Sequence, residues 1–327
     1  MIALPRSRGA PGWLARMGQG MLALLVGVVL CATPVTSLLA LGWLSRRMAW
    51  RVQQRFGMLA EAPGWILGAQ GAGRWERALG GLAANITHGL HSLVALMAWS
   101  LPFSALWLGA WWAGWENSFN KGYEQAFAGP AVFVTGLLIA AVVLPVIPFM
   151  LAHMAAEGRL AAAFQLRRIR GVMAQAGWRV AGLAVLTFGA GLPFIGFHGF
   201  AALAPGVFLR IEAMTPDQLA DLRGWLTLGA AAYAFGTLWV LRSIAARTYA
   251  TAAPRAAGLR PGLWDGALAS EVAMPARAQS RVLTTLWVTV AMAAGAGMGA
   301  QLVVAQFINH AWWRWVFHPF FALPWAG

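Results

Sequence analysis

Three histidines are the side chains of this sequence best suited to hold a cofactor within an apolar stretch. His88 and His91 are three residues apart, so on a helix they share one face. His153 ends the next apolar stretch and would lie at a similar depth in a bilayer. Imidazole binds haem iron and divalent metals. We expect no metal and no cofactor, because interfacial histidines can also bond loop backbone; a haem or pigment held by these three is the alternative.

Arginines form two basic faces suited to anionic lipid headgroups. In the first, arginine recurs every four residues, which places three guanidinium groups on one side of a helix. The second lies in 158–177, where basic residues alternate with apolar ones. Each arginine near a membrane surface contributes about 1 kcal/mol of attraction to anionic lipid. The simpler alternative is that both faces only fix orientation. The predicted headgroup ligands are Arg46, Arg47, Arg51, Arg55, Arg167, Arg168 and Arg170.

The sequence shows no pattern of an enzyme or of an ion-coupled transporter. All 10 acidic residues lie outside the apolar stretches, whereas ionisable residues within them would mark an ion path. There is no phosphate-binding loop, dinucleotide fingerprint or zinc-protease motif, and Cys31 is the single cysteine. We therefore expect a non-enzymatic protein.

The elements that position these residues are membrane helices. The chain is 60% hydrophobic and 10% charged, against about 25% charged in soluble domains. About 20 residues are needed to cross a bilayer core of about 30 Å, and a helix leaves no backbone group unpaired. We predict an all-α bundle of five clear spans with an N-terminal kinked span or hairpin and an interfacial C-terminal segment. The apolar regions are 20–44, 88–114, 131–154, 180–204, 224–241 and 282–307.

Arginine also predicts orientation, because basic residues collect on the cytoplasmic side. Most of them fall in alternate connecting segments, and the C-terminus is then periplasmic. The arginine bias over lysine, with abundant alanine and glycine, indicates a GC-rich bacterial genome and hence a bacterial inner membrane. The predicted cytoplasmic segments are 45–87, 155–179 and 242–281. The predicted outer segments are 115–130, 205–223 and 308–327.

The first apolar region allows two structures. A single span would leave Arg6, Arg8 and Arg16 on the outer side, against the same rule. A re-entrant hairpin would avoid this, with its bend at Pro34 and with Thr33 and Thr36 bonding the freed backbone groups. The alternative is one kinked span with these arginines outside.

Small residues and prolines suggest how the helices pack. Gly295 and Gly299, four residues apart, predict a face that another helix can approach closely. Pro34, Pro102 and Pro193 lie near the middle of their apolar regions and would kink them. Kinks at one depth either shape a midplane cavity, as in carriers, or only curve a packed bundle.

Four places resemble a family of bacterial multi-pass membrane proteins of unknown function. The resemblance implies a helical membrane fold and brings no activity and no catalytic residues. The four places are Pro34 to Trp43 with the arginines that follow, Asn117 to Gln125, Ala156 to Arg170, and His318 to Trp325.

We therefore expect an accessory, scaffold or assembly protein of a bacterial inner membrane. Its partners would be anionic lipid and a membrane protein or a second copy, and not nucleic acid, because the basic residues lie in short segments between apolar spans. One alternative is a carrier or channel for a neutral or anionic small solute. A second is a haem- or pigment-binding subunit.

Overall fold

All secondary structure in the described part of the chain is helical, and no strand occurs there, as expected from the sequence. The computed structural model describes residues 13–58, 62–65, 73–111, 128–207, 214–277, 286 and 288–290. The α-helices are α1 (Trp13–Cys31), α2 (Pro34–Arg55), α3 (Arg74–Trp111), α4 (Ala128–Val143), α5 (Ile147–Glu157), α6 (Leu166–Ala176), α7 (Trp178–Val207) and α9 (Pro216–Leu259). Short 3-10 turns are η3 (Leu160–Phe164), η4 (Pro261–Leu263) and η5 (Leu268–Ser270).

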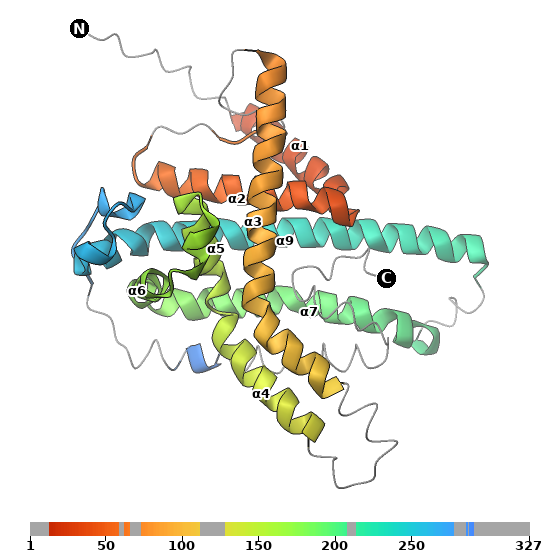
Figure 1. Ribbon diagram of the computed structural model, residues 1–327. Coiled ribbons are helices and arrows are strands. Elements are labelled where there is room, and N and C mark those ends of the chain that lie inside the picture. Colours follow the sequence, from red (N-terminus) through yellow and green to blue (C-terminus); the bar gives the residue numbers. More distant parts are fainter. Residues whose placement is uncertain are drawn as a thin grey trace.

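The first apolar region is two helices rather than one. Thr33 is extended, with φ −131° and ψ 152°, because the residue before a proline is kept out of the helical conformation. The Thr36 hydroxyl donates to the carbonyl of Leu30 at 2.6 Å, and the Thr36 amide donates to the Thr33 hydroxyl at 3.4 Å. The expected role of these threonines is confirmed. From this break α1 and α2 fold back on each other (Figure 1). That the pair re-enters the membrane stays a prediction.

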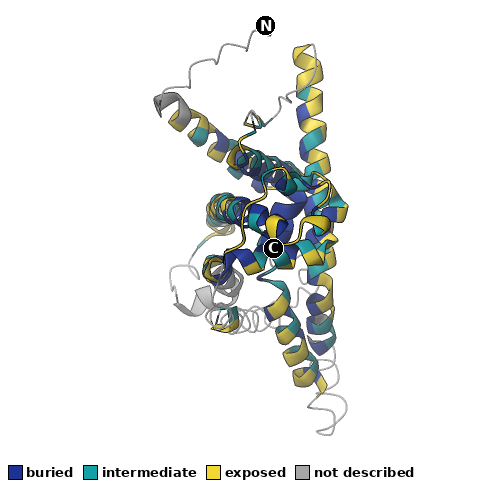
Figure 2. Ribbon diagram, turned by 90° about the vertical axis from the view of Figure 1, so that its left-hand side faces the viewer, coloured by how far each residue is buried: buried dark blue, intermediate teal, exposed yellow. Residues whose placement is uncertain are grey.

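Helices α2 and α3 cross in close backbone contact. A methyl group on Gly42 would overlap the carbonyl oxygen of Asn85, and one on Gly89 would overlap the carbonyl oxygen of Leu38. Beside this crossing, the hydroxyls of Ser45 and Ser92 are hydrogen-bonded at 2.6 Å. In both views α3 runs across α9 rather than alongside it (Figures 1 and 2).

Prolines break the next apolar region. Helices α4 and α5 are bent by 45° at residues 144–146, where Pro145 cannot donate a backbone hydrogen bond. Pro148 lies in the first turn of α5, a position that tolerates proline. Gly158, with φ 69°, then ends α5 in the left-handed conformation.

The longest helix, α9, joins the arginine-rich segments into one core. It begins with a capping box in which Thr215 and Gln218 bond each other's backbone amides. Its second half packs on α2, α5 and α6, and small residues lie at the contact: a methyl group added to Gly171 would lie 3.7 Å from the side chain of Ala256. Trp264, between η4 and η5, is fully buried in the same core.

Many large apolar side chains are exposed, among them Leu79, Leu90 and Leu101 of α3. Figure 2 shows exposed residues along the length of this helix. On length and composition, two described helices are apolar enough to cross a membrane, α3 and α9, or three if the bent pair α4–α5 counts as one span. The apolar helices at Met17–Cys31 and Trp178–Gly191 are shorter. The expected count of five to six spans is therefore not confirmed, and 282–307 lies almost wholly outside the described residues.

Candidate functional site

A basic groove runs between α2 and α9. The spacing of its arginines on α2 places them on one helix face, and Arg247 from α9 faces them. The groove has a volume of about 350 Å³, and no carboxylate is among the described residues that line it. We call it the basic groove; it is lined by Arg47, Trp50, Arg51, Gln54, Arg55 and Arg247.

Arg47 is held by aromatic rings. Its guanidinium carbon lies 5.1 Å from the ring centre of Trp43, 5.6 Å from that of Trp50 and 4.8 Å from that of Trp239. Trp43 is itself stacked on Trp65 at 4.3 Å. These cation–π contacts orient the guanidinium but give its buried Nε no hydrogen-bond acceptor among the described residues. Arg47 is thus fixed in place and can still donate a hydrogen bond.

The charges of the groove repel one another. Burial, and then the charge of Arg51, lower the pKa of Arg47 to about 10. Burial, and then the charge of Arg247, lower the pKa of Arg51. Both shifts mean that burial and a neighbouring like charge disfavour the charged form. An anion bound there would relieve both effects.

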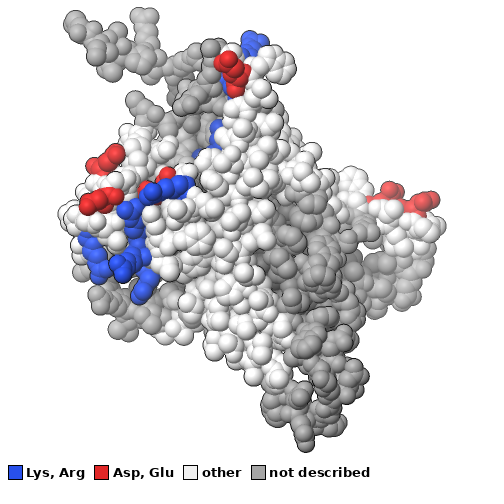
Figure 3. Space-filling model, in the orientation of Figure 1, with Lys and Arg blue, Asp and Glu red and all other residues white. Residues whose placement is uncertain are grey.

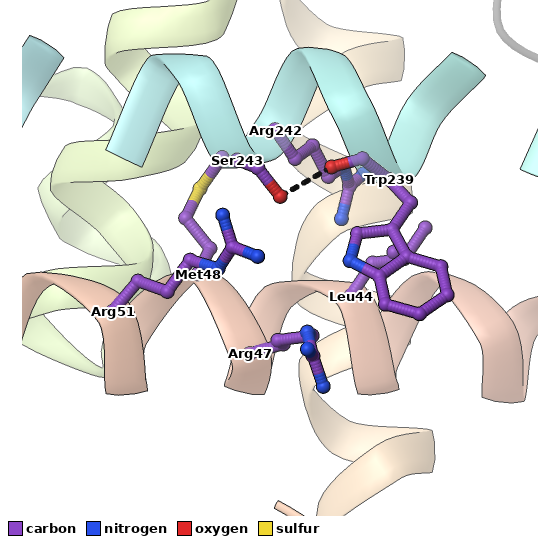
Figure 4. Close-up of a pocket in the computed structure, with 7 residues that line it drawn as sticks. All are labelled: Leu44, Arg47, Met48, Arg51, Trp239, Arg242 and Ser243. Atoms are coloured by element: carbon purple, nitrogen blue, oxygen red, sulfur yellow. Dashed lines mark hydrogen bonds between the residues drawn. The ribbon is translucent and has the colours of Figure 1, made fainter. Parts of the chain in front are cut away.

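Arg242 lies beneath the groove and was not singled out from the sequence. Figure 4 shows its side chain reaching from α9 toward α2, in a small cavity that Arg47 and Arg51 also line. It is 5% exposed, and its Nη1 donates to the Leu41 carbonyl at 3.1 Å and to the Ser45 hydroxyl at 3.0 Å. Its Nε and Nη2 are buried without a partner in the described structure. One signal was available: Arg242 is the first charge after the apolar stretch 224–241.

Other predicted headgroup ligands are used differently. Arg46 turns away from the groove and donates to the Asn85 side chain at 2.8 Å. Arg168 donates through Nε to the Leu263 carbonyl at 2.8 Å and lies 5.6 Å from the ring centre of Trp264. These two guanidinium groups hold segments of the fold together. Arg167 and Arg170 are exposed on α6, and their contact with lipid stays a prediction.

The three histidines are not assembled into one metal site. Within the described ranges, no three His, Cys, Asp or Glu residues are placed to hold a metal ion. His88 and His91 share a face of α3, as expected, with ring centres 6.2 Å apart. His153 is fully buried; its Nδ1 lies 2.8 Å from the Tyr249 hydroxyl, and its Nε2 lies 2.9 Å from Oε1 of Gln165. Both of its ring nitrogens therefore already have protein partners, which are side chains rather than the expected loop backbone.

The remaining predicted packing site, Gly295 with Gly299, lies outside the described residues, as do 115–127 and 308–327. No protein-family model, curated protein or solved structure matches the chain. The resemblance stated from its motifs therefore gains no support from them. What the fold and the groove define is an all-helical protein with two to three helices apolar enough to span a membrane.

Proposed function

We propose that this chain is a non-enzymatic accessory, scaffold or assembly protein of a bacterial inner membrane. Its basic groove holds anionic lipid, and its exposed apolar helices contact a membrane-protein partner or a second copy. The observation that carries the proposal is the groove itself, because four arginines and no carboxylate are among the described residues that line it. Such a surface needs an anion, and the headgroups of an anionic leaflet supply one.

The surroundings of the groove support a binding role over catalysis. An ion pair joins Arg159 to Glu157 at 3.9 Å, and neither residue is among those that line the groove. Besides its arginines, the described residues that line the groove are Trp50 and Gln54, and neither is a general acid, base or nucleophile. The described part of the groove can therefore orient and neutralise an anion, and it offers no group to transform one.

The test is extraction of the protein from its native membrane into lipid-retaining polymer discs. We expect a membrane protein in stoichiometric amount, or a second copy of the chain, together with enrichment of anionic over zwitterionic lipid. Protein identification and mass spectrometry of the lipid classes in the purified discs measure both. Recovery of the chain alone as a monomer would contradict the scaffold role. A lipid content equal to that of the bulk membrane would contradict the lipid contact.

A further inference from the structure

We propose that the basic groove is a specific site for one lipid headgroup that carries two phosphate groups. The inference rests on the proposed function, since it takes the surrounding solvent to be a bilayer. It goes further in giving the groove one ligand with a defined number of phosphates. Lipids of this class are the diphosphatidylglycerols and the polyprenyl diphosphates.

Charge fixes the number of phosphates. Among the described residues that line the groove there are four guanidinium groups and no carboxylate. A single phosphodiester brings one negative charge and would leave most of the repulsion among Arg47, Arg51 and Arg247 in place. Two phosphates bring at least two charges and enough oxygens for several bidentate arginine contacts, which are the strongest hydrogen bonds that arginine makes.

The floor of the groove is already built for an anion. Three indole rings hold Arg47, so little side-chain entropy remains to be lost when it binds. Arg242 lies beneath with Nε and Nη2 unpartnered, in a cavity that shares Arg47 and Arg51 with the groove. A buried cation without a counter-ion is costly, and its field favours an anion just above it. Positive charge therefore lies both in the groove and in the small buried cavity next to it.

Position along α9 assigns the ligand to the membrane. From 224 to 241 the helix carries no charged residue, a length of about 27 Å at 1.5 Å per residue, close to the thickness of a hydrocarbon core. Arg242 and Arg247 follow directly, so the groove lies at the level of the headgroups. Val240, about two turns before Arg247 on α9, is 58% exposed and offers an apolar surface to an acyl chain. Trp50 in the groove wall is typical of this depth.

Native mass spectrometry of the full chain in detergent tests the proposal, with four probes: diphosphatidylglycerol, phosphatidylglycerol, a polyprenyl diphosphate and inorganic pyrophosphate. We expect one diphosphatidylglycerol or polyprenyl diphosphate to bind at about tenfold lower concentration than phosphatidylglycerol. The double variant Arg51→Gln with Arg247→Gln should weaken this binding at least about tenfold, since each lost charge-assisted contact is worth about one such factor. The matched control, Arg74→Gln with Arg77→Gln at exposed positions of α3, makes the same change in charge outside the groove and should stay within about twofold.

Each other outcome decides against the proposal. Equal binding of phosphatidylglycerol per phosphate, or equal weakening in the α3 control, would show a general anion-binding surface; the proposed function would then stand without this site. Binding of pyrophosphate as tight as that of the lipids would assign the groove to a soluble diphosphate. If the double variant does not fold, Arg247→Gln alone, at an exposed position, serves instead and should still weaken binding. The scaffold role is tested separately by the extraction into polymer discs, where the absence of a partner would contradict it.

Discussion

At the scale of single residues, the hydrogen bonds of His153 define its tautomer. Arg168 donates to Oε1 of Gln165 at 3.2 Å, and an arginine can only donate, so this oxygen is an acceptor. His153 must therefore donate to it through Nε2. Nδ1 then carries no proton and accepts from the hydroxyl of Tyr249. His153 is a buried neutral link among α5, α6 and α9, with no lone pair left for a ligand.

Removal of the Tyr249 hydroxyl tests how much this link contributes to the free energy of unfolding. Tyr249→Phe leaves Nδ1 of His153 buried without a donor, and an unsatisfied buried polar group costs about 1–3 kcal/mol. We expect the free energy of unfolding, measured by titration with SDS in mixed micelles, to fall by that amount.

The matched control is Tyr233→Phe, also on α9. The Tyr233 hydroxyl donates to the Ala190 carbonyl at 2.9 Å on the surface of the molecule, and Ala190 lies within helix α7. That carbonyl is not left buried and unpaired when the hydroxyl is removed, so we expect a change below about 0.5 kcal/mol. Equal effects of the two variants would contradict a structural role for the His153 link.

At the scale of elements, the sequence predicted those features that depend on residues adjacent in the chain. Pro34 and its flanking threonines indicated the break between α1 and α2, because a proline restricts the residue before it wherever the chain goes. The partners of His153 could not be predicted in this way, since Tyr249 is 96 residues distant in sequence. The same holds for the basic groove, in which the spacing of the α2 arginines was visible but Arg247 and Arg242 meet them only after folding.

The spacing of residues in α3 already indicates that another helix can approach it closely. Gly81, Asn85 and Gly89 are small residues four apart, the pattern that lets helices approach. We expect Gly42→Ala and Gly89→Ala each to lower the free energy of unfolding by about 1–3 kcal/mol, because the new methyl group overlaps backbone atoms that cannot rotate away.

Glycine in open space should behave in the opposite way. A methyl group on Gly229, within α9, meets no other atom within 4 Å. Gly229→Ala should therefore raise the free energy of unfolding by about 0.5–1 kcal/mol through the higher helix propensity of alanine. The same SDS titration measures all three variants. A stabilised Gly42→Ala protein would show that the helices do not cross at this point.

At the scale of the whole molecule, the core and the surface are both apolar and differ in side-chain size. Alanine is the most frequent buried residue, whereas leucine, valine and tryptophan are common among the exposed ones. Figure 3 shows a wide uncharged surface over α3 and α4, with basic side chains gathered where α6 meets the end of α9. Small residues inside allow close helix packing, and large ones outside suit contact with lipid.

The expected number of spans is not confirmed, and hydropathy counts apolar residues without their direction. The candidate span Arg74–Trp107 has 34 residues, about 51 Å of helix, far more than a core of about 30 Å requires. Since α3 also runs across α9, the two cannot both follow the bilayer normal. The uncharged part of α9 matches the core thickness when upright. We therefore expect α9 to cross nearly along the normal and α3 to be strongly tilted.

Cysteine labelling in intact cells tests the crossing by α9. Cys31 is the single cysteine and is buried, so Cys31→Ala gives a background without labelling. A cysteine in place of Gln218, at the start of α9, should react with a membrane-impermeant maleimide from outside. Cysteines in place of Arg260, just after α9, and of the exposed Arg167 should react only after the inner membrane is opened.

The physical reason is that the apolar stretch between Gln218 and Arg260 fills one bilayer, while arginines at its far end are held at the cytosolic face. Labelling of residues 218 and 260 from the same side would show that α9 does not cross, and the headgroup level assigned to the basic groove would be lost with it.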